Sequence, residues 1–390
     1  MEEKYGGIIE SKNNFWFSKI NWCSTSYQSL ISCEMKLFNY LKNKSDLSFI
    51  PIENQAQFMR SLECYKAFKS DDGRNLYDNK IPIVLIHGLG GGVGLWIKNL
   101  DSISEFRKVY AMDLLGFGFS SRPKFPEDPV GVENMFVESL EQWRKVMKLN
   151  KFILLGHSLG GYLACAYAIK FPEYIRHLIL ADPWGIIQSD PTEMTILKKS
   201  TILRTAYPIL KSFNPMALVR MSGPFGKNLI KRFMSDFGNF FENENDAEDG
   251  SGKCVSVKSD DVLDYIYHCN AQYPSGETAF KTLLIDFGTA YRSMVDRTNE
   301  MDKSIPISFI YGGKSWMNVS GGLRIFEKRS DSYVDIRVLP DIGHHIYVQN
   351  AQEFNTTVNE ICETIDSYSD ILLNTMPKER YKTVKQSFDK

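Results

Sequence analysis

The sequence predicts an α/β protein with a mostly parallel, doubly wound sheet. Two observations predict it. Short runs that are apolar throughout alternate along the chain with helical patterns, as expected for parallel strands covered by helices on both faces. Some of these runs also end in glycine-rich turns that lead into the next element. The predicted strands are residues 82–87, 107–112, 151–156, 177–182, 305–311 and 333–339.

The third of these runs leads directly into GHSLG, a G-x-S-x-G pattern centred on Ser158. In so tight a strand-to-helix turn, side chains two residues either side of the serine would clash, so Gly156 and Gly160 are required. The Ser158 hydroxyl is then exposed at a helix N-terminus, whose dipole favours developing negative charge. The pattern predicts Ser158 as a nucleophile.

The first run ends in the loop HGLGGG, which starts at His87. Glycines such as Gly88 and Gly90 let backbone N–H groups approach a substrate oxyanion. We predict the N–H groups of Leu89 and Leu159 as the oxyanion-hole donors. Because such a loop works through its backbone, His87 is predicted to hold the loop in shape.

The last predicted strand is followed by Gly343, His344 and His345. A nucleophile first and a histidine last is the order of catalytic groups in the α/β-hydrolase fold. Either histidine could act as general base, and the preceding glycine favours His344. The three motifs together predict an α/β-hydrolase fold.

Two helices and one loop carboxylate are also predicted around this core. Helical patterns cover residues 130–147 and 351–365, the second with Asn350 as its N-cap. Asp113 follows a predicted strand and precedes the glycines of LLGFGFS. It is expected to fix that loop and not to act in catalysis.

Composition excludes several classes of protein. The 390 residues include 46 basic and 47 acidic side chains, a balance that gives no indication of nucleic-acid binding. The 7 cysteines are scattered without C-x-x-C spacing, which argues against a disulfide framework or a zinc site and indicates reduced thiols in an intracellular protein. We expect no metal or organic cofactor. No secretion signal and no membrane-spanning run is recognised.

The alternation of strands and helices stops after Trp184 and resumes near residue 287. The intervening sequence is helical, irregular and rich in apolar residues, as in a cap inserted over the serine. Its apolar side chains suit an acyl chain or amphiphile, or form the core of the cap itself. The predicted organisation is an N-terminal segment (1–60), a first core part (61–185), a mainly helical cap (186–286) with a mobile acidic loop (241–261), a second core part (287–368) and a tail (369–390).

Four aromatic residues lie within eight positions near the N-terminus: Phe15, Trp16, Phe17 and Trp22. Amphipathic aromatics of this kind favour a lipid–water boundary. Alternatively they pack on the hydrolase core as a structural belt.

Longer segments carry a specific resemblance. The chain resembles the alpha/beta-hydrolase domain-containing protein 4 and 5 subfamily from about Trp22 to Asp366, including the cap. Members act on lysophospholipids and N-acyl phospholipids, have been assigned lysophosphatidic acid acyltransferase activity, or serve as lipid-droplet coactivators of a triacylglycerol lipase. The segments are GHSLGGYLACAYAIKFPEYIRHLILADPWG, HGLGGGVGLW, AMDLLGFGFSSRP, FNPMALVRMSGPFG, YIYHCNAQYPSGETAF and GHHIYVQNAQEFN.

The resemblance implies a serine hydrolase that cleaves acyl ester or amide bonds of phospholipids or lysophospholipids, in lipid homeostasis and phospholipid remodelling. The coactivator branch has asparagine at the nucleophile, so Ser158 resembles the hydrolase branch. The aromatic segment resembles the droplet-anchoring segment of the coactivators, which favours lipid contact. The implied location is cytoplasmic, on lipid droplets or on membranes such as those of the mitochondrion or endoplasmic reticulum. The alternatives are a lysophosphatidic acid acyltransferase, or a non-catalytic lipid-droplet coactivator that binds a triacylglycerol lipase.

One departure from the subfamily concerns the acid that orients His344. Relatives carry an aspartate after the strand that ends in YGGKSW, where this chain has Asn318. An amide can hold an imidazole but supplies no negative charge to an imidazolium. Asp182 is the candidate to replace that charge, because it ends the strand next in sequence after the nucleophile strand. Alternatively, Asp182 only braces its loop.

A second departure concerns the H-x₄-D pattern proposed for acyl transfer in the subfamily. The histidine of this pattern corresponds to His344, which favours His344 over His345. The position of the aspartate is occupied by Gln349 in this chain. A neutral glutamine cannot polarise a histidine as a carboxylate does. An acyl-enzyme on Ser158 could nevertheless pass its acyl group to a lysophospholipid.

Overall fold

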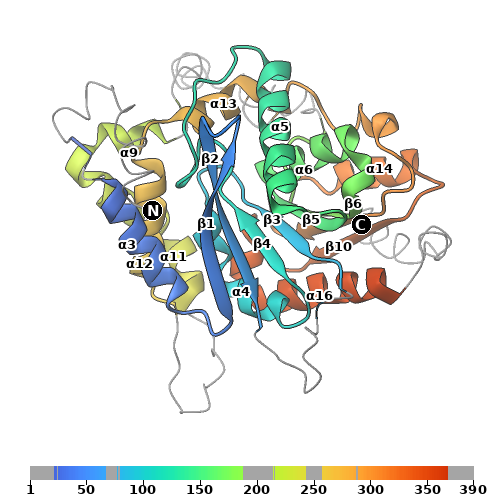
Figure 1. Cartoon of the computed structure of the whole chain (residues 1–390), viewed down its shortest axis with the longest axis horizontal. Helices are drawn as coiled ribbons and strands as arrows, with labels where there is room; N and C mark the ends of the chain where they lie inside the picture. The colour runs from blue at the N-terminus through green and yellow to red at the C-terminus, as the bar shows by residue number, and fades with distance from the viewer. Residues whose placement is uncertain are drawn as a thin grey trace.

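The computed structural model describes residues 22–23, 25–66, 77, 80–187, 214, 216–242, 257–286 and 289–367. At its centre lies an eight-stranded sheet in the order β1-β2-β4-β3-β5-β6-β9-β10 (Figure 1). β2 pairs antiparallel with both β1 and β4, and the other neighbours pair in parallel. The strands are β1 Lys44–Ile52, β2 Gln57–Tyr65, β3 Ile83–Ile86, β4 Val109–Met112, β5 Phe152–His157, β6 Ile175–Ala181, β9 Ile307–Gly312 and β10 Val334–Leu339.

The six strands predicted from apolar runs are all present, from β3 to β10. Their side chains alternate between two hydrophobic layers, which explains why the runs are apolar throughout. In β3, Val84 and Ile86 point into one layer, whereas Ile83 and Leu85 point into the other. The sheet is therefore doubly wound and mostly parallel, as predicted.

The hairpin of β1 and β2 extends this sheet at one edge and was not among the predicted strands. β1 reads KSDLSFIPI and is only partly buried, so it lacks the continuous apolar run that marks the central strands. The predicted boundary at residue 60 falls inside β2. The residues before it therefore include part of the central sheet.

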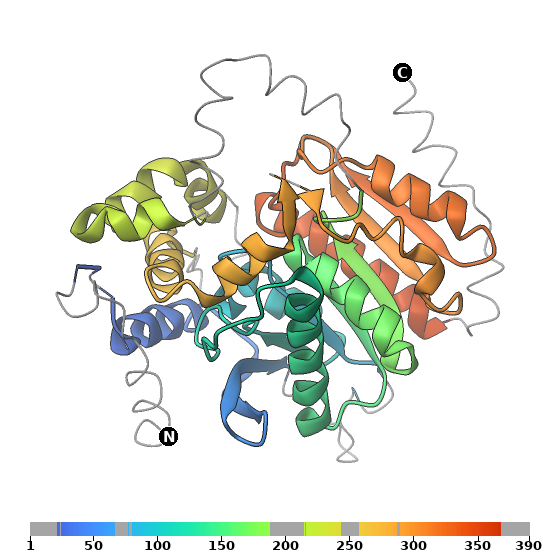
Figure 2. The ribbon, with the colours of Figure 1, turned by 90° about the horizontal axis from the view of Figure 1, so that it is seen from above.

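Helices cover both faces of the sheet (Figures 1 and 2). The helix predicted over 130–147 is present as α5, and the one predicted over 351–365 is present as α16, with Asn350 Oδ1 accepting from the Glu353 N–H at 3.0 Å. Side chains of α5 and α6 pack into one hydrophobic layer, and those of α4 and α16 pack into the other. These elements are η1 Val93–Trp96, α4 Ile97–Ser104, α5 Pro129–Met147, α6 Leu159–Lys170, η2 Pro172–Tyr174, η4 Thr298–Glu300, α14 Ser320–Lys328, α15 Ile346–Gln349 and α16 Ala351–Ser367.

A mainly helical cap is inserted between β6 and β9, as predicted. Most of the cap forms, together with the N-terminal helix α3, a lobe at the left of Figures 1 and 2, whereas its last helix, α13, lies above the sheet in Figure 1. The predicted acidic loop, 241–261, lies mostly outside the described residues, and its ends belong to α11 and α12. The elements of this lobe and the small hairpin that follows it are α3 Tyr27–Phe38, α9 Ala217–Met221, η3 Gly223–Phe225, α10 Gly226–Phe233, α11 Ser235–Glu242, α12 Ser259–Asn270, α13 Ser275–Leu283, β7 Leu284–Asp286 and β8 Thr289–Ala290.

The N-terminal helix binds the cap directly. The Tyr40 hydroxyl, just after α3, donates to Asp261 Oδ2 of α12 at 2.9 Å, and Thr25 Oγ1 lies 3.0 Å from His268 Nδ1 of the same helix. α3 and the cap are consequently one packed unit, although about 180 residues separate them in sequence.

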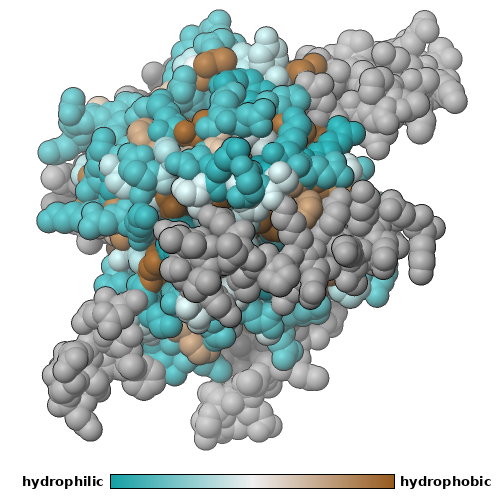
Figure 3. Space-filling model, turned by 90° about the vertical axis from the view of Figure 1, so that its right-hand side faces the viewer, coloured by the Kyte–Doolittle hydropathy of each residue, from teal (hydrophilic) through white to brown (hydrophobic). Residues whose placement is uncertain are grey.

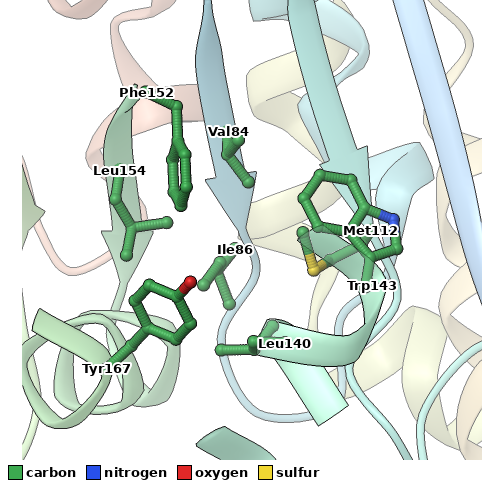
Figure 4. Close-up of a pocket in the computed structure, with 8 residues that line it drawn as sticks. All are labelled: Val84, Ile86, Met112, Leu140, Trp143, Phe152, Leu154 and Tyr167. Carbon is green, nitrogen blue, oxygen red and sulfur yellow. The ribbon is translucent and has the colours of Figure 1, made fainter. Parts of the chain in front are cut away.

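A small apolar cavity of about 10 Å³ lies between the sheet and helices α5 and α6 (Figure 4). It is at or below the size that holds one water molecule. The two polar side-chain groups on its wall are satisfied, since Trp143 donates to Ser61 Oγ at 3.1 Å and Tyr167 donates to Glu141 at 2.7 Å. The cavity is therefore a packing gap of the core and holds no ligand. Its lining residues are Val84, Ile86, Met112, Leu140, Trp143, Phe152, Leu154 and Tyr167.

Candidate active site

Ser158 occupies the sharp turn between β5 and α6. Its φ of 53° and ψ of −118° lie outside the ordinary regions for a residue with a side chain. A Cβ on Gly156 would collide with the Gly160 carbonyl, and one on Gly160 would collide with the backbone carbonyls of the neighbouring strand β3. Both glycines are required for the reason expected from the sequence.

His344 lies within hydrogen-bonding distance of this serine. The Ser158 hydroxyl donates to His344 Nε2 at 3.1 Å, and His344 Nδ1 donates to Asp182 Oδ2 at 2.6 Å. A serine, a histidine and a carboxylate thus form one continuous hydrogen-bonded chain. This is the arrangement in which the histidine can take the serine proton while the carboxylate stabilises the imidazolium.

Asp182 is fully buried one residue beyond β6. Its backbone has φ of 45°, and its N–H donates to Ile310 of β9 at 2.7 Å. Its Oδ1 accepts from Gly312 N at 3.1 Å, and the Ser315 hydroxyl donates to Oδ2. The carboxylate therefore accepts hydrogen bonds from His344, Gly312 and Ser315.

Asn318 does not lie in this chain of hydrogen bonds. Its side chain is exposed, and its Oδ1 accepts from the backbone N–H of Ser320 at 2.8 Å, at the start of α14. The expectation of Asn318 as a neutral orienter of His344 finds no support in this geometry, because Asp182 binds His344 Nδ1. The loop after β9 instead contributes Ser315, which holds Asp182.

His345 has a different environment from its neighbour. Burial lowers its pKa to about 3, and its ring packs edge-on against Phe237 of the cap helix α11 at 4.6 Å. His344 contacts Ser158, whereas the His345 ring is turned toward the cap. The geometry accordingly favours His344 as the base.

The loop that begins at His87 lies against the serine. A Cβ on Gly88 would come within 3.0 Å of Ser158 Cβ, so only glycine fits between loop and nucleophile. His87 Nε2 accepts from the Leu114 N–H at 2.9 Å, and Nδ1 donates to the Gly88 carbonyl at 2.7 Å. Burial lowers the pKa of His87 to about 4, which keeps it neutral. His87 holds the loop, as its sequence context predicts.

This hydrogen bond also orients the proposed oxyanion donor. In a trans peptide the carbonyl and the N–H point in opposite directions. Because His87 binds the Gly88 carbonyl, the Leu89 N–H of the same peptide points away from His87. Leu159 is the first residue of α6, directly after Ser158, so its N–H belongs to the free N-terminal turn of that helix. The loop that carries Leu89 thus lies against Ser158, and Leu159 follows Ser158 directly.

The cap reaches into the same loop. Gly90 has φ of 69°, and its carbonyl accepts from Asn270 Nδ2 of α12 at 2.8 Å. A Cβ on Gly90 would lie 3.2 Å from the methyl carbon of Met216. The cap therefore helps to shape the loop that carries the Leu89 N–H.

Buried Asp113 and partly buried Arg122 connect the loop after β4 to its surroundings. Asp113 accepts from Val93 N and Phe119 N, each at 2.7 Å, which is the loop-fixing role expected for it. Arg122 donates to the carbonyls of four residues in this loop and the cap. They are Gly116, Gly118, Cys269 and Tyr273.

Several residues of the site carry no signal in the motifs. Ser315 binds the acid, Asn270 binds the glycine loop, and His157 Nε2 lies 3.0 Å from the His344 carbonyl. Trp316 is 63% exposed, and its ring centre lies 5.1 Å from that of His344. Only the position of His157 inside GHSLG marks it in the sequence, because the other contacts join segments that are distant along the chain.

The remaining expectations are only partly covered by the described residues. Phe15, Trp16 and Phe17 lie outside them, whereas Trp22 is described and exposed. Within the described ranges, no three or more His, Cys, Asp or Glu side chains are grouped so as to hold a metal ion. Nor does any helix there combine the length and hydropathy needed to cross a bilayer. The cysteines of the described part are free.

The chain belongs to the family of the alpha/beta hydrolase fold, which it matches over residues 81–351. It is 40% identical over 366 residues to the (Lyso)-N-acylphosphatidylethanolamine lipase of Mus musculus, covering 92% of this chain and 99% of that protein. It is 45% identical over 289 residues to the 1-acylglycerol-3-phosphate O-acyltransferase ABHD5 of Homo sapiens, covering 74% and 79%. These relatives confirm the subfamily resemblance.

Solved structures share the fold at low sequence identity. A bacterial membrane phospholipase A matches with a TM-score of 0.58 at 15% identity, over 94% of this chain and 100% of that one. The carboxylesterase CesB of Bacillus subtilis matches with a TM-score of 0.54 at 13% identity, over 85% and 96%. These matches concern the fold alone.

Proposed function

We propose that this protein is a serine hydrolase that cleaves acyl ester or amide bonds of phospholipids and lysophospholipids. The observation that carries the proposal is the hydrogen-bonded chain from Ser158 through His344 to Asp182. The choice of substrate class rests on the relatives, one of which is named a (lyso)-N-acylphosphatidylethanolamine lipase.

In the acylation step, Ser158 Oγ attacks the substrate carbonyl as His344 Nε2 takes its proton. The carboxylate of Asp182 stabilises the imidazolium through the Nδ1–H bond. The N–H groups of Leu89 and Leu159 bind the oxyanion of the tetrahedral intermediate. His344 then gives its proton to the leaving alcohol or amine, which leaves an acyl ester on Ser158.

In the deacylation step, His344 takes a proton from water, which attacks the acyl ester. The tetrahedral intermediate collapses, Ser158 Oγ recovers the proton, and a fatty acid is released. These steps need no cofactor, since every proton passes between groups named here.

We infer that Asp182 takes the place of the acid in a chain that has Asn318. β6 and β9 are neighbours, and Ala181 pairs with Ile310. A carboxylate one residue beyond β6 thus lies beside the loop after β9, from which relatives supply their aspartate. The Ser315 hydroxyl and the Gly312 N–H of that loop then bind the carboxylate.

A fluorophosphonate probe is expected to label the wild-type protein, and the Ser158→Ala variant is expected to remain unlabelled. The same variant should lose fatty acid release from lysophosphatidylcholine and N-acyl phosphatidylethanolamine, because the attacking oxygen is absent. Circular dichroism of the variant controls for folding. A folded wild-type protein with neither labelling nor turnover would contradict the proposal and favour a non-catalytic coactivator of a triacylglycerol lipase.

A second candidate function is acyl transfer to a lysophospholipid such as lysophosphatidic acid. The observation in its favour is the contact of Gln349, whose Oε1 accepts from the Gly343 N–H. This residue holds the backbone directly before His344, whereas the imidazole nitrogens of His344 bind Asp182 and Ser158. Its neutrality therefore removes no charge from the proposed proton path.

Replacing Gln349 by leucine is expected to lower kcat about tenfold or more, because the partly buried Gly343 N–H loses its acceptor, at a cost of about 1–3 kcal/mol, and the histidine loop is released. Gln349→Glu keeps the acceptor and should stay within about threefold of wild type. Steady-state hydrolysis, and phosphatidic acid formed when lysophosphatidic acid is added, would be measured for both. Equal losses in the two variants would contradict the loop-holding role.

We also propose that the protein acts at lipid surfaces, on droplets or intracellular membranes, with the segment that contains Phe15, Trp16, Phe17 and Trp22 in lipid contact. The support is the amphipathic character of these side chains and the exposure of Trp22.

A further inference from the structure

Three large apolar side chains are exposed together on the cap. Leu218 and Met221 of α9 are 66% and 54% exposed, and Phe225 of η3 is 71% exposed. Trp22, which is 39% exposed, lies against the same segment. We call Trp22, Leu218, Met221 and Phe225 the cap patch.

Trp22 is bound to the cap by its polar atom and by its ring. Its indole N–H donates to the Met221 carbonyl at 3.1 Å. A Cβ on Gly223, which has φ of 54°, would collide with the indole ring of Trp22 and lie 2.7 Å from its nitrogen. The neighbouring Cys23 Sγ donates to the Arg220 carbonyl at 3.2 Å. Because the indole N–H is already satisfied, the exposed part of the ring needs no water.

The patch is at one end of the molecule. α9 lies at the outer end of the lobe formed by α3 and the cap, in both ribbon views (Figures 1 and 2). The visible coloured surface of the opposite side is predominantly hydrophilic, with apolar residues scattered among polar ones (Figure 3). The cap patch gathers three exposed apolar side chains within residues 218–225.

A short stretch of chain connects the patch to the proposed active site. Met216 lies against Gly90 of the oxyanion loop, and its backbone N–H donates to Glu277. Arg220, between the exposed residues, forms an ion pair with the same Glu277 at 2.7 Å. The segment 216–225 thus runs from the oxyanion loop to the surface.

Two lysines beside the patch are neutralised. Lys227 of α10 pairs with Asp264 at 2.6 Å, and Lys231 pairs with Asp260 at 2.6 Å. Their positive charges are thus compensated by carboxylates of the cap itself. A partner attracted by the apolar side chains alone fits this arrangement better than an anionic one.

We propose that the cap patch inserts into the surface of a phospholipid monolayer or bilayer and so places the entrance to the active site on the lipid. A lipid surface fits because an acyl substrate must leave such a surface to reach Ser158, and segment 216–225 spans that path. The sequence that leads into Trp22 is of the same aromatic type. This inference rests on the proposed function for its substrate but concerns a separate surface.

The test uses full-length protein with the triple change Leu218→Ser, Met221→Ser and Phe225→Ser. A matched control is Phe106→Ser with Val146→Ser, two residues that are 49% and 46% exposed outside the cap. Flotation with phosphatidylcholine vesicles measures binding, and turnover is measured for lysophosphatidylcholine in vesicles and for a short water-soluble ester.

The triple variant is expected to bind vesicles at least about tenfold more weakly, because its serine side chains bury no apolar surface in the lipid. Turnover in vesicles should fall in parallel, whereas turnover of the soluble ester should stay within about twofold of wild type. The control should bind like wild type, and high salt should leave wild-type binding largely intact.

Vesicle binding equal to wild type in the triple variant would overturn the proposal, as would wild-type binding that disappears in high salt. A change of oligomeric state in the triple variant, with vesicle binding retained, would instead make the patch a contact between copies. Flotation needs no catalysis, so failure of the soluble ester assay alone would contradict the proposed function and leave this result valid.

Discussion

Asp182→Asn is expected to lower kcat for ester hydrolysis about 10⁴-fold, equivalent to about 5.5 kcal/mol of transition-state stabilisation. The amide can still occupy the site, but it supplies no negative charge to the His344 imidazolium. It can also turn an N–H toward His344 Nδ1 and so disfavour the productive tautomer. The comparison is kcat of wild type and variant on a water-soluble ester, with fluorophosphonate labelling rates as a second readout.

Asn318→Ala is the matched control, because this residue lies in the loop after β9, where the subfamily resemblance predicts the acid. Its side chain binds Ser320 N and is exposed, so kcat should change by no more than about threefold. A large loss in Asn318→Ala together with a small one in Asp182→Asn would show that the loop after β9 still orients His344, and Asp182 would then be a structural brace.

Glu34→Ala is expected to destabilise the protein by about 3–5 kcal/mol, because it leaves the buried guanidinium of Arg60 without its counter-ion. Glu34 belongs to α3 and Arg60 to β2, and Arg60 Nε donates to Glu34 Oε2 at 3.1 Å. The guanidinium also lies 4.6 Å from the ring centre of Phe49 and 5.3 Å from that of Phe119. The pair therefore fixes α3 to the sheet in surroundings that exclude water.

Denaturation by urea, followed by circular dichroism, would measure this loss. Asp46→Ala is the control, since Asp46 forms an exposed pair with Lys44 at 3.9 Å and should cost at most about 1 kcal/mol. If Glu34→Ala were as mild as the control, water or another acid would have to solvate Arg60.

The central strands and the nucleophile are predictable from sequence because their causes are local. A strand buried on both faces must be apolar throughout, and a turn as tight as that at Ser158 must have glycine at both sides. β1 could not be predicted in this way, because it lies at the sheet edge, is only partly buried and has no continuous apolar run. The register between paired strands decides which loops meet, and it depends on segments that are far apart in sequence.

The role of Asp182 shows most clearly what cannot be predicted from the sequence. The sequence identifies it as a candidate by its place at a strand end, but does not decide between a catalytic partner and a brace. That decision depends on the pairing of Ala181 with Ile310 and on the Ser315 hydroxyl, which lies more than 130 residues away in sequence. Asn270, which binds the oxyanion loop from the cap, is hidden for the same reason.

The union of α3 with the cap changes how a shortened form of this protein should be understood. Removing residues 1–30 to take away a lipid anchor would also remove Trp22 from Gly223, Thr25 from His268 and the first turn of α3. Trp22, Thr25 and α3 thus belong to the packing of the cap, in addition to the lipid contact proposed for Trp22. Single substitutions, and not truncation, can therefore test lipid binding separately from catalysis in this molecule.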